Sequence, residues 1–129
     1  MMDVEKKLAE LGIDLSAGPE PMANYVSVQK AGGFWFFSGA GPFENGKPVV
    51  FGRLGENLTT KEGYDAARLA GINLLAVLKR ELGGDWDRLE QIVKVQGFVN
   101  STTDYFEQPL VINGVSDLFG EVLGERGRH

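Results

Sequence analysis

The sequence has no cysteine, and its single histidine is the last of 129 residues, His129. The lack of cysteine excludes disulfides, thiol nucleophiles and thiolate metal sites together. The lack of an internal histidine excludes a Ser-His-Asp triad and a histidine-based metal cluster. We therefore expect a protein that uses neither a metal nor a cofactor.

Long apolar runs are also missing from the sequence. No stretch approaches the roughly 20 apolar residues that a membrane-spanning helix needs. Charged residues interrupt any signal-peptide pattern at the start of the chain, namely Asp3, Glu5, Lys6 and Lys7. These features predict a soluble, cytoplasmic protein that has no membrane partner.

Basic residues are in the minority, with 13 lysines and arginines against 18 acidic residues. The resulting net charge is −5. Surfaces that bind nucleic acid usually carry a basic excess, so this balance disfavours nucleic acid as a partner. A local basic patch remains compatible with the composition.

The length and the hydrophobic content of 43% suit one domain with its own core, which we place at residues 1–129. Its first pattern runs from Asp3 to Leu11, where Val4, Leu8 and Leu11 share one side of a short amphipathic helix. Gly12 supplies the helix end. We expect this helix to pack on the outside of the core.

The longest helical pattern runs from Thr59 to Leu82. Thr59 and Glu62 have the spacing of a capping box, and Gly83-Gly84 marks the end of the helix. One face carries apolar or small residues at steps of three and four, namely Ala67, Ala70, Gly71, Leu74, Leu75, Leu78 and Leu82. The first half of this face is small, so it predicts a close neighbour, for which a sheet would fit.

Shorter patterns before this helix predict strands. Tyr25–Lys30 and Phe34–Ser38 flank Ala31-Gly32-Gly33 and form a predicted β-hairpin. Lys47–Phe51 follows a predicted tight turn at Glu44-Asn45-Gly46. The run FWFF in the second strand is apolar at four successive positions, which indicates a strand covered on both faces by its own helices or by another subunit.

After the long helix, Asp85 caps a predicted helical turn in which Trp86 is expected to anchor the core. Gln91–Ser101 follows as a predicted strand, with Val93, Val95 and Val99 on one face. A second core helix is predicted from apolar residues at helical spacing, closed by Gly124: Val111, Val115, Leu118 and Val122. Helices segregated between runs of strands in this way predict an α+β fold and not a doubly wound one.

The ordered set of these segments resembles the RidA/YjgF family of reactive-intermediate deaminases. The resemblance rests on YVSVQKAGGFWFFSGAGP, the ENG turn, EGYDAARLAGINLLAVLK, VKVQGFVNS and INGVSDLFGEVLG. It is closest to the branch in which residues 1–12 are an added N-terminal helix. The resemblance implies a chorismate-mutase-like fold, a mixed sheet with two main helices on one face, and a homotrimer with clefts between subunits.

Members of the best-studied branch hydrolyse enamine and imine intermediates, such as 2-aminoacrylate, to 2-keto acids and ammonia. The resemblance therefore implies a small carboxylate-bearing imine or keto acid as the ligand. The composition permits this chemistry, because a protonated imine carbon is already electrophilic and needs only a held ligand and a positioned water. Two alternatives stay open: a ligand-binding or regulatory trimer without turnover, and the endoribonuclease role sometimes attached to the family, which the net charge disfavours.

The resemblance also implies the ligand-contacting residues. Tyr25 matches the tyrosine that closes the family's cleft, Ser38-Gly39 matches its Ser-Gly pair, and Asn113 matches the asparagine of its last helix. Each of these also has a purely structural interpretation, in strand packing, in a turn and on a polar helix face. Ala40 stands where the deaminating branch usually has glutamine.

The family's substrate-clamping arginine and its last strand pair are expected beyond His129. From this we expect either a C-terminally shortened version of a longer gene product or a chain whose missing part was not included. Arg126 and Arg128 are the alternative carboxylate binders, set against their interpretation as solvated charges at a helix end.

Overall fold

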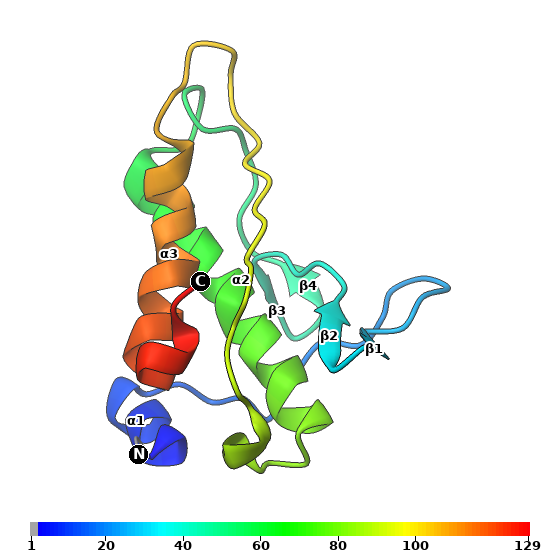
Figure 1. Ribbon diagram of the computed structural model, residues 1–129. Helices are drawn as coiled ribbons and strands as arrows, with labels where there is room; N and C mark the ends of the chain where they lie inside the picture. The colour runs from blue at the N-terminus through cyan, green and yellow to red at the C-terminus, as the bar shows by residue number, and fades with distance from the viewer. Residues whose placement is uncertain (1–2) are drawn as a thin grey trace.

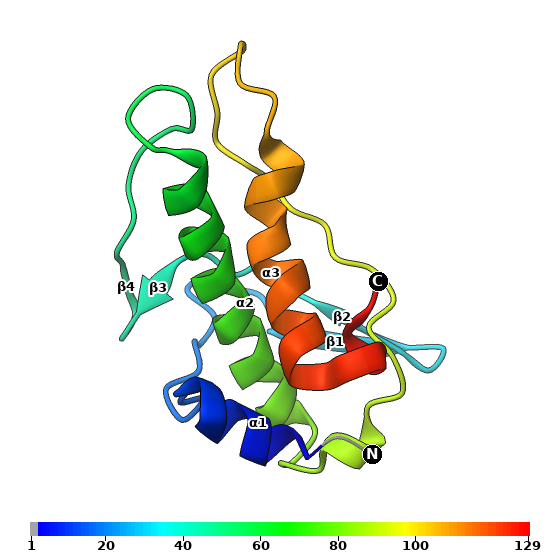
Figure 2. The ribbon, with the colours of Figure 1, turned by 90° about the vertical axis from the view of Figure 1, so that its left-hand side faces the viewer.

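Three α-helices dominate the computed structural model, which describes residues 3–129 of the chain. They are α1 (Val4–Leu11), α2 (Thr60–Glu81) and α3 (Gln108–Leu123). The helices α2 and α3 run side by side, and α1 lies across one end of the pair (Figures 1 and 2). The predicted N-terminal helix is confirmed over its described residues, while positions 1 and 2 of the predicted 1–12 segment lie outside them.

The capping box predicted for α2 is confirmed at its first turn. Thr59 Oγ1 accepts a hydrogen bond from the Glu62 amide at 3.2 Å, and Glu62 Oε1 accepts one from the Thr59 amide at 3.0 Å. Because two of the otherwise unpaired amides are satisfied reciprocally, the start of the helix is fixed locally. Gly83 and Gly84, both at positive φ, follow its end as predicted.

The small face of α2 packs against α3, where a sheet was expected. A Cβ added at Gly71 would lie 2.9 Å from a methyl carbon of Leu118, and one at Gly114 would overlap the Tyr64 carbonyl oxygen. Glycine on both helices therefore lets the two backbones approach closely. This helix pair provides the centre of the fold.

The core lies between the three helices and the short helical turn η1 (Trp86–Arg88). Asp85 caps that turn and Trp86 is buried, as predicted. Trp86 Nε1 donates to Glu5 Oε1 at 3.1 Å, which ties the turn to α1. The least exposed side chains of the core are Leu75, Leu118, Leu123 and Val122.

The predicted first hairpin is confirmed, although it is shorter than the pattern suggested. Strands β1 (Val28–Ala31) and β2 (Phe34–Phe37) pair antiparallel, and Gly32 and Gly33 turn the chain at φ of 60° and 81°. Two consecutive residues at positive φ suit the right-handed twist of a hairpin.

A second hairpin follows at the predicted Asn45-Gly46 turn. Strands β3 (Phe43–Glu44) and β4 (Lys47–Pro48) are two residues each, and both turn residues have positive φ. The predicted strand Lys47–Phe51 therefore stops after its second residue. Among residues 3–129, the sheets are these two antiparallel pairs. Small antiparallel hairpins therefore stand where the resemblance implies a mixed sheet.

The prediction of a paired strand at Gln91–Ser101 is wrong for this chain. The segment runs extended past the helices without a strand partner along most of its length (Figure 1). Its contacts differ at the two ends, because the Ile92 amide donates to the Arg126 carbonyl at 2.8 Å and Ser101 forms an isolated bridge to Leu54. Val93 is 64% exposed while Val95 packs on the core, so the predicted common face of valines does not form.

The FWFF strand is covered on one face. Trp35 and Phe37 pack against the helical core, and the Lys30 ammonium lies 4.1 Å from the centre of the Trp35 ring. Phe34 and Phe36 point the other way and are 56% and 62% exposed. The helices of the chain thus cover half of this strand.

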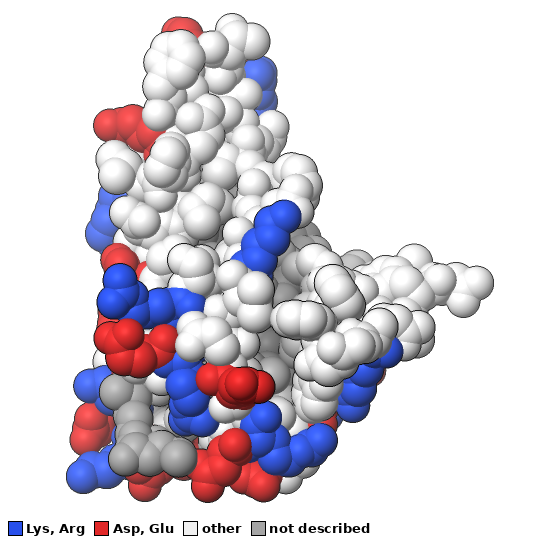
Figure 3. Space-filling model, in the orientation of Figure 1, with Lys and Arg blue, Asp and Glu red and all other residues white. Residues whose placement is uncertain are grey.

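Charged side chains gather over the end of the molecule where α1 lies (Figure 3). The opposite end and much of the hairpin side carry only a few charged side chains in the same view. Within residues 3–129, each helix is too short or too polar to cross a membrane.

Candidate functional site

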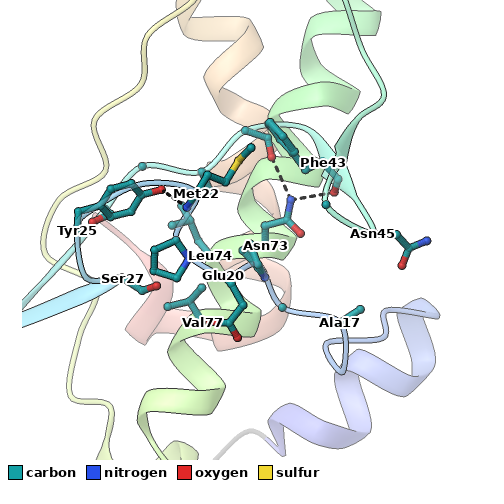
Figure 4. Close-up of a pocket in the computed structure, with 18 residues that line it drawn as sticks. Ala17, Glu20, Met22, Tyr25, Ser27, Phe43, Asn45, Asn73, Leu74 and Val77 are labelled. Atoms are coloured by element: carbon teal, nitrogen blue, oxygen red, sulfur yellow. Dashed lines mark hydrogen bonds between the residues drawn. The ribbon is translucent and has the colours of Figure 1, made fainter.

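A pocket of about 540 Å³ lies between the segment before β1, the loop from β2 to β3, and one face of α2 (Figure 4). Its walls are mostly small or apolar, with a few hydroxyl and amide groups. The lining residues are Ala17, Gly18, Pro19, Glu20, Pro21, Met22, Tyr25, Ser27, Ser38, Gly39, Ala40, Gly41, Phe43, Asn45, Gly46, Asn73, Leu74 and Val77.

Tyr25, Ser38 and Gly39 all line this pocket. The Ser38 hydroxyl donates to the Val26 carbonyl at 2.7 Å, so its lone pairs remain as acceptors. The Tyr25 hydroxyl accepts from the Met22 amide at 3.4 Å and keeps its own proton to donate. A Cβ added at Gly39 would meet no atom within 4 Å, so this backbone borders open space.

Asn113 is not brought to the same place. It is exposed on α3 and lies outside the lining of the pocket. The chain therefore assembles three of the four residues that the resemblance implies.

Arg126 is neither a solvated charge nor a wall of the pocket. Its Nη1 donates to the carbonyls of Trp86 and Leu89 at 2.9 and 3.1 Å, and its Nη2 is buried without a partner among residues 3–129. The interpretation of Arg126 as a replacement carboxylate binder is wrong for this pocket, because Arg126 is not among the residues that line it. Arg128 is exposed and lies 3.6 Å from Glu125, as expected of a solvated charge.

The pocket carries little charge of its own. Glu20 is the one carboxylate among its described lining residues, and lysine, arginine and histidine are absent from that set. The carboxylate of Glu20 lies 3.0 Å from Arg80 Nη1, while Arg80 Nη2 donates to the Pro19 carbonyl at 3.1 Å. Ligands would therefore meet mainly neutral hydrogen-bonding groups. Residues 3–129 form no cluster of three or more metal-binding side chains.

Asn73 was not singled out from the sequence, yet it is buried in the wall of the pocket. Its Nδ2 donates to the carbonyls of Gly41 and Phe43, both at 3.0 Å (Figure 4). These bonds tie the loop from β2 to β3 onto α2. The signal was present, because Asn73 falls three residues after Ala70 and four before Val77, on a stripe that is otherwise apolar.

A family model described as "YjgF/chorismate mutase-like, putative endoribonuclease" matches residues 5–129. Among curated proteins, Protein TCP17 of Trypanosoma cruzi is 40% identical over 127 residues. That match covers 98% of this chain and 79% of the relative.

Two solved structures are similar in both sequence and fold. A protein from Shewanella oneidensis MR-1, described as a "putative endoribonuclease", has a TM-score of 0.93 at 35% identity, with 99% of this chain and 84% of that chain covered. Atu1372 of Agrobacterium tumefaciens, a protein of unknown function, has a TM-score of 0.89 at 40% identity, with 98% and 77% covered. Both likenesses extend over nearly the whole of this chain.

Proposed function

The chain belongs to the YjgF/chorismate-mutase-like family, and from this premise we propose that it hydrolyses small enamines or imines to 2-keto acids and ammonia. The resemblance noted in the sequence and the α+β class are thereby confirmed. The proposal places the reaction in the pocket of Tyr25, Ser38 and Gly39, with 2-aminoacrylate as a representative substrate.

The observation that carries the proposal is the meeting of these three residues in one pocket. They come from the connector before β1 and from the end of β2, and the fold brings them to a shared wall. The pairing of the hairpin, which the Ser38 amide continues by donating to the Ser27 carbonyl at 2.9 Å, holds Ser38 beside the segment that carries Tyr25. The pocket volume of about 540 Å³ is ample for a short-chain imino acid.

Hydrolysis of an imine needs a positioned water more than a strong base. Water adds to the protonated C=N carbon, a proton moves from oxygen to nitrogen, and ammonia leaves as the C=O bond forms. In this proposal Ser38 Oγ accepts a hydrogen bond from the attacking water, because its proton is already donated to Val26. Tyr25 donates to the substrate. The reaction balances with water as the only co-reactant.

A homotrimer is part of the proposal, because a neighbouring subunit could then supply Asn113 and close the open side of the pocket. The expected partner is a small carboxylate-bearing imine, held by neutral donors.

The second candidate function is ligand binding or regulation without turnover. One observation favours it: the carboxylate of Glu20 is paired with Arg80, so the pocket has no free charged base among its described residues. RNA cleavage, which the description of the Shewanella protein suggests for that protein, has weaker support here. A net charge of −5 and a pocket wall without lysine or arginine among the described residues offer little attraction for phosphate.

The deciding experiment generates 2-aminoacrylate in the assay and measures keto-acid release with and without the protein. We expect release faster than the spontaneous rate, with a drop of about tenfold or more for Ser38→Ala if the hydroxyl orients the water. Thr103→Ala, at an exposed position far along the chain, serves as the control. Saturable ligand binding without release would favour the non-catalytic alternative, and salt-sensitive RNA cleavage would favour the nuclease.

A further inference from the structure

The side-chain amide of Asn73 has an orientation that its neighbours dictate. The carbonyl oxygens of Gly41 and Phe43 both lie 3.0 Å from the same terminal atom of Asn73. Carbonyl oxygens only accept hydrogen bonds, so the atom that faces them must be the NH₂ group. If the amide were rotated by half a turn, Oδ1 would face the two carbonyl oxygens, and the three oxygens would repel one another. Oδ1 is therefore held on the other side.

That oxygen is an acceptor in need of a donor. Asn73 is 9% exposed, and no donor is paired with its Oδ1 among residues 3–129. The pocket lining holds apolar side chains such as Phe43, Leu74 and Val77, and it also holds polar ones, none of which is paired with Oδ1: Tyr25, Ser27, Ser38 and Asn45. Among the described residues, Oδ1 is not one of the fully buried unpaired side-chain atoms, so it is open to the pocket and free to accept an N–H or O–H from a ligand.

We propose that Asn73 Oδ1 accepts a hydrogen bond from the ligand and makes the pocket selective for compounds that carry an N–H donor. Applied to the function proposed above, on which this part rests, Oδ1 binds the nitrogen of the enamine or iminium substrate. The same atom discriminates against the keto acid. Hydrolysis replaces C=N–H by C=O, so the product presents an acceptor to an acceptor and is released. Asn73 is then a specificity-determining residue that also fixes the loop after β2.

The test uses a stable pair of ligands that differ only in the donor. The first, 2-aminobenzoate, carries an NH₂ group on an sp² carbon and a carboxylate on the adjacent carbon, so it presents the same two groups as an enamine substrate with one more carbon between them. The second, 2-methylbenzoate, has a methyl group of similar size in its place. Calorimetric titration of the natural chain should show 2-aminobenzoate binding about tenfold more tightly, equivalent to about 1.4 kcal/mol. Equal affinities for the two compounds would overturn the proposal.

Variants of the chain then identify the residue that causes the difference in affinity between the two ligands. Asn73→Leu keeps the approximate volume and removes the acceptor, so the affinity ratio should fall to about one. Ser27→Ala removes another polar group of the same pocket and should leave the ratio unchanged. Selectivity lost in the serine variant and kept in the leucine variant would refute the assignment.

Asn73→Leu also removes the two bonds to the loop and can fail to fold. A measurement on the natural chain covers this case: the side-chain NH₂ resonances of Asn73 should shift with 2-aminobenzoate more than with 2-methylbenzoate. Identical shifts would count against the proposal. Failure of keto-acid release would remove the deaminase function alone, because the ligand pair reports on binding and not on turnover.

Discussion

Single glycines set the distance between α2 and α3, and two glycines of α3 have opposite surroundings. A Cβ at Gly114 would overlap the Tyr64 carbonyl oxygen and lie 2.9 Å from the Arg68 amide, both in the backbone of α2. A Cβ at Gly120 would meet nothing within 4 Å. The same substitution should therefore change stability in opposite directions at the two positions.

Gly114→Ala should lower the free energy of unfolding by about 1–3 kcal/mol or more, because a helix backbone must move to make room. Gly120→Ala should raise it by about 0.5–1 kcal/mol, since alanine restricts the unfolded chain and favours helix. Urea denaturation of both variants measures the difference. Equal stabilities would contradict the close approach of the two helices.

The free energy of unfolding should depend on pH through the ionisation of Glu5. Hydrogen bonds from Lys79, at 2.8 Å, and from Trp86 hold the pKa of Glu5 below its ordinary value of 4.5. A carboxyl group with a lowered pKa in the folded state stabilises the fold above its ordinary pKa. This contribution is lost as the pH falls through the lowered value.

We therefore expect Glu5→Gln to be less stable than the natural chain near pH 7, with a difference that shrinks as the pH falls below 4.5. Denaturation at a series of pH values measures it. Glu10→Gln serves as the control, because this residue of α1 lies 3.8 Å from its nearest cation, Lys7, and should give a smaller difference. A constant gap for Glu5→Gln across the series would show that the ionised carboxylate does not stabilise the fold.

At the scale of elements, the start of α2 depends on a pair of reciprocal hydrogen bonds. Thr59→Ala removes one acceptor of the capping box and should cost about 1 kcal/mol of stability. Thr59→Ser retains the hydroxyl and should recover most of that loss. Thermal unfolding of the two variants tests the role of the hydroxyl, and an alanine variant as stable as the serine variant would argue against it.

The elements that sequence predicted best are those whose signals are local. Thr59 and Glu62 identify a helix start without reference to the rest of the chain, and Asn45-Gly46 does the same for a turn. Segment 91–101 has the composition of a strand, but pairing depends on a neighbour that the pattern cannot specify. Its contacts in this chain go to Arg126 and Leu54 instead.

The residues of the candidate site also differ in how well the sequence predicts them. Tyr25 and Ser38 were found through a resemblance that reads residues in order along the chain. Asn73 was missed because its importance lies in bonds to Gly41 and Phe43, which are about 30 positions away in sequence. The sequence signal of such a bond is an asparagine on an otherwise apolar helix face, because a buried amide needs hydrogen-bond partners.

At the scale of the whole molecule, the isolated chain exposes more surface than its mass suggests. A compact monomer of 14.1 kDa should expose about 6,700 Å², whereas this chain exposes 8086 Å². The excess of about 1,400 Å² is larger than the area of about 800 Å² that a protein typically buries against one partner. Phe34 and Phe36, on the uncovered face of β2, contribute apolar area to it.

The last prediction follows from this uncovered face. We expect the chain to form a homotrimer, in which each subunit has two neighbours and the outer face of β2 lies in an interface. Light scattering at low micromolar concentration should give about three times the chain mass of 14.1 kDa. Phe36→Glu should shift the mass toward that of a monomer, because an unpaired carboxylate would be buried in an apolar contact. Lys61→Glu, on the exposed first turn of α2, introduces the same side chain elsewhere and should leave the assembly intact. A natural chain that stays monomeric would remove the trimer. A trimer that tolerates Phe36→Glu would place its interface on another face.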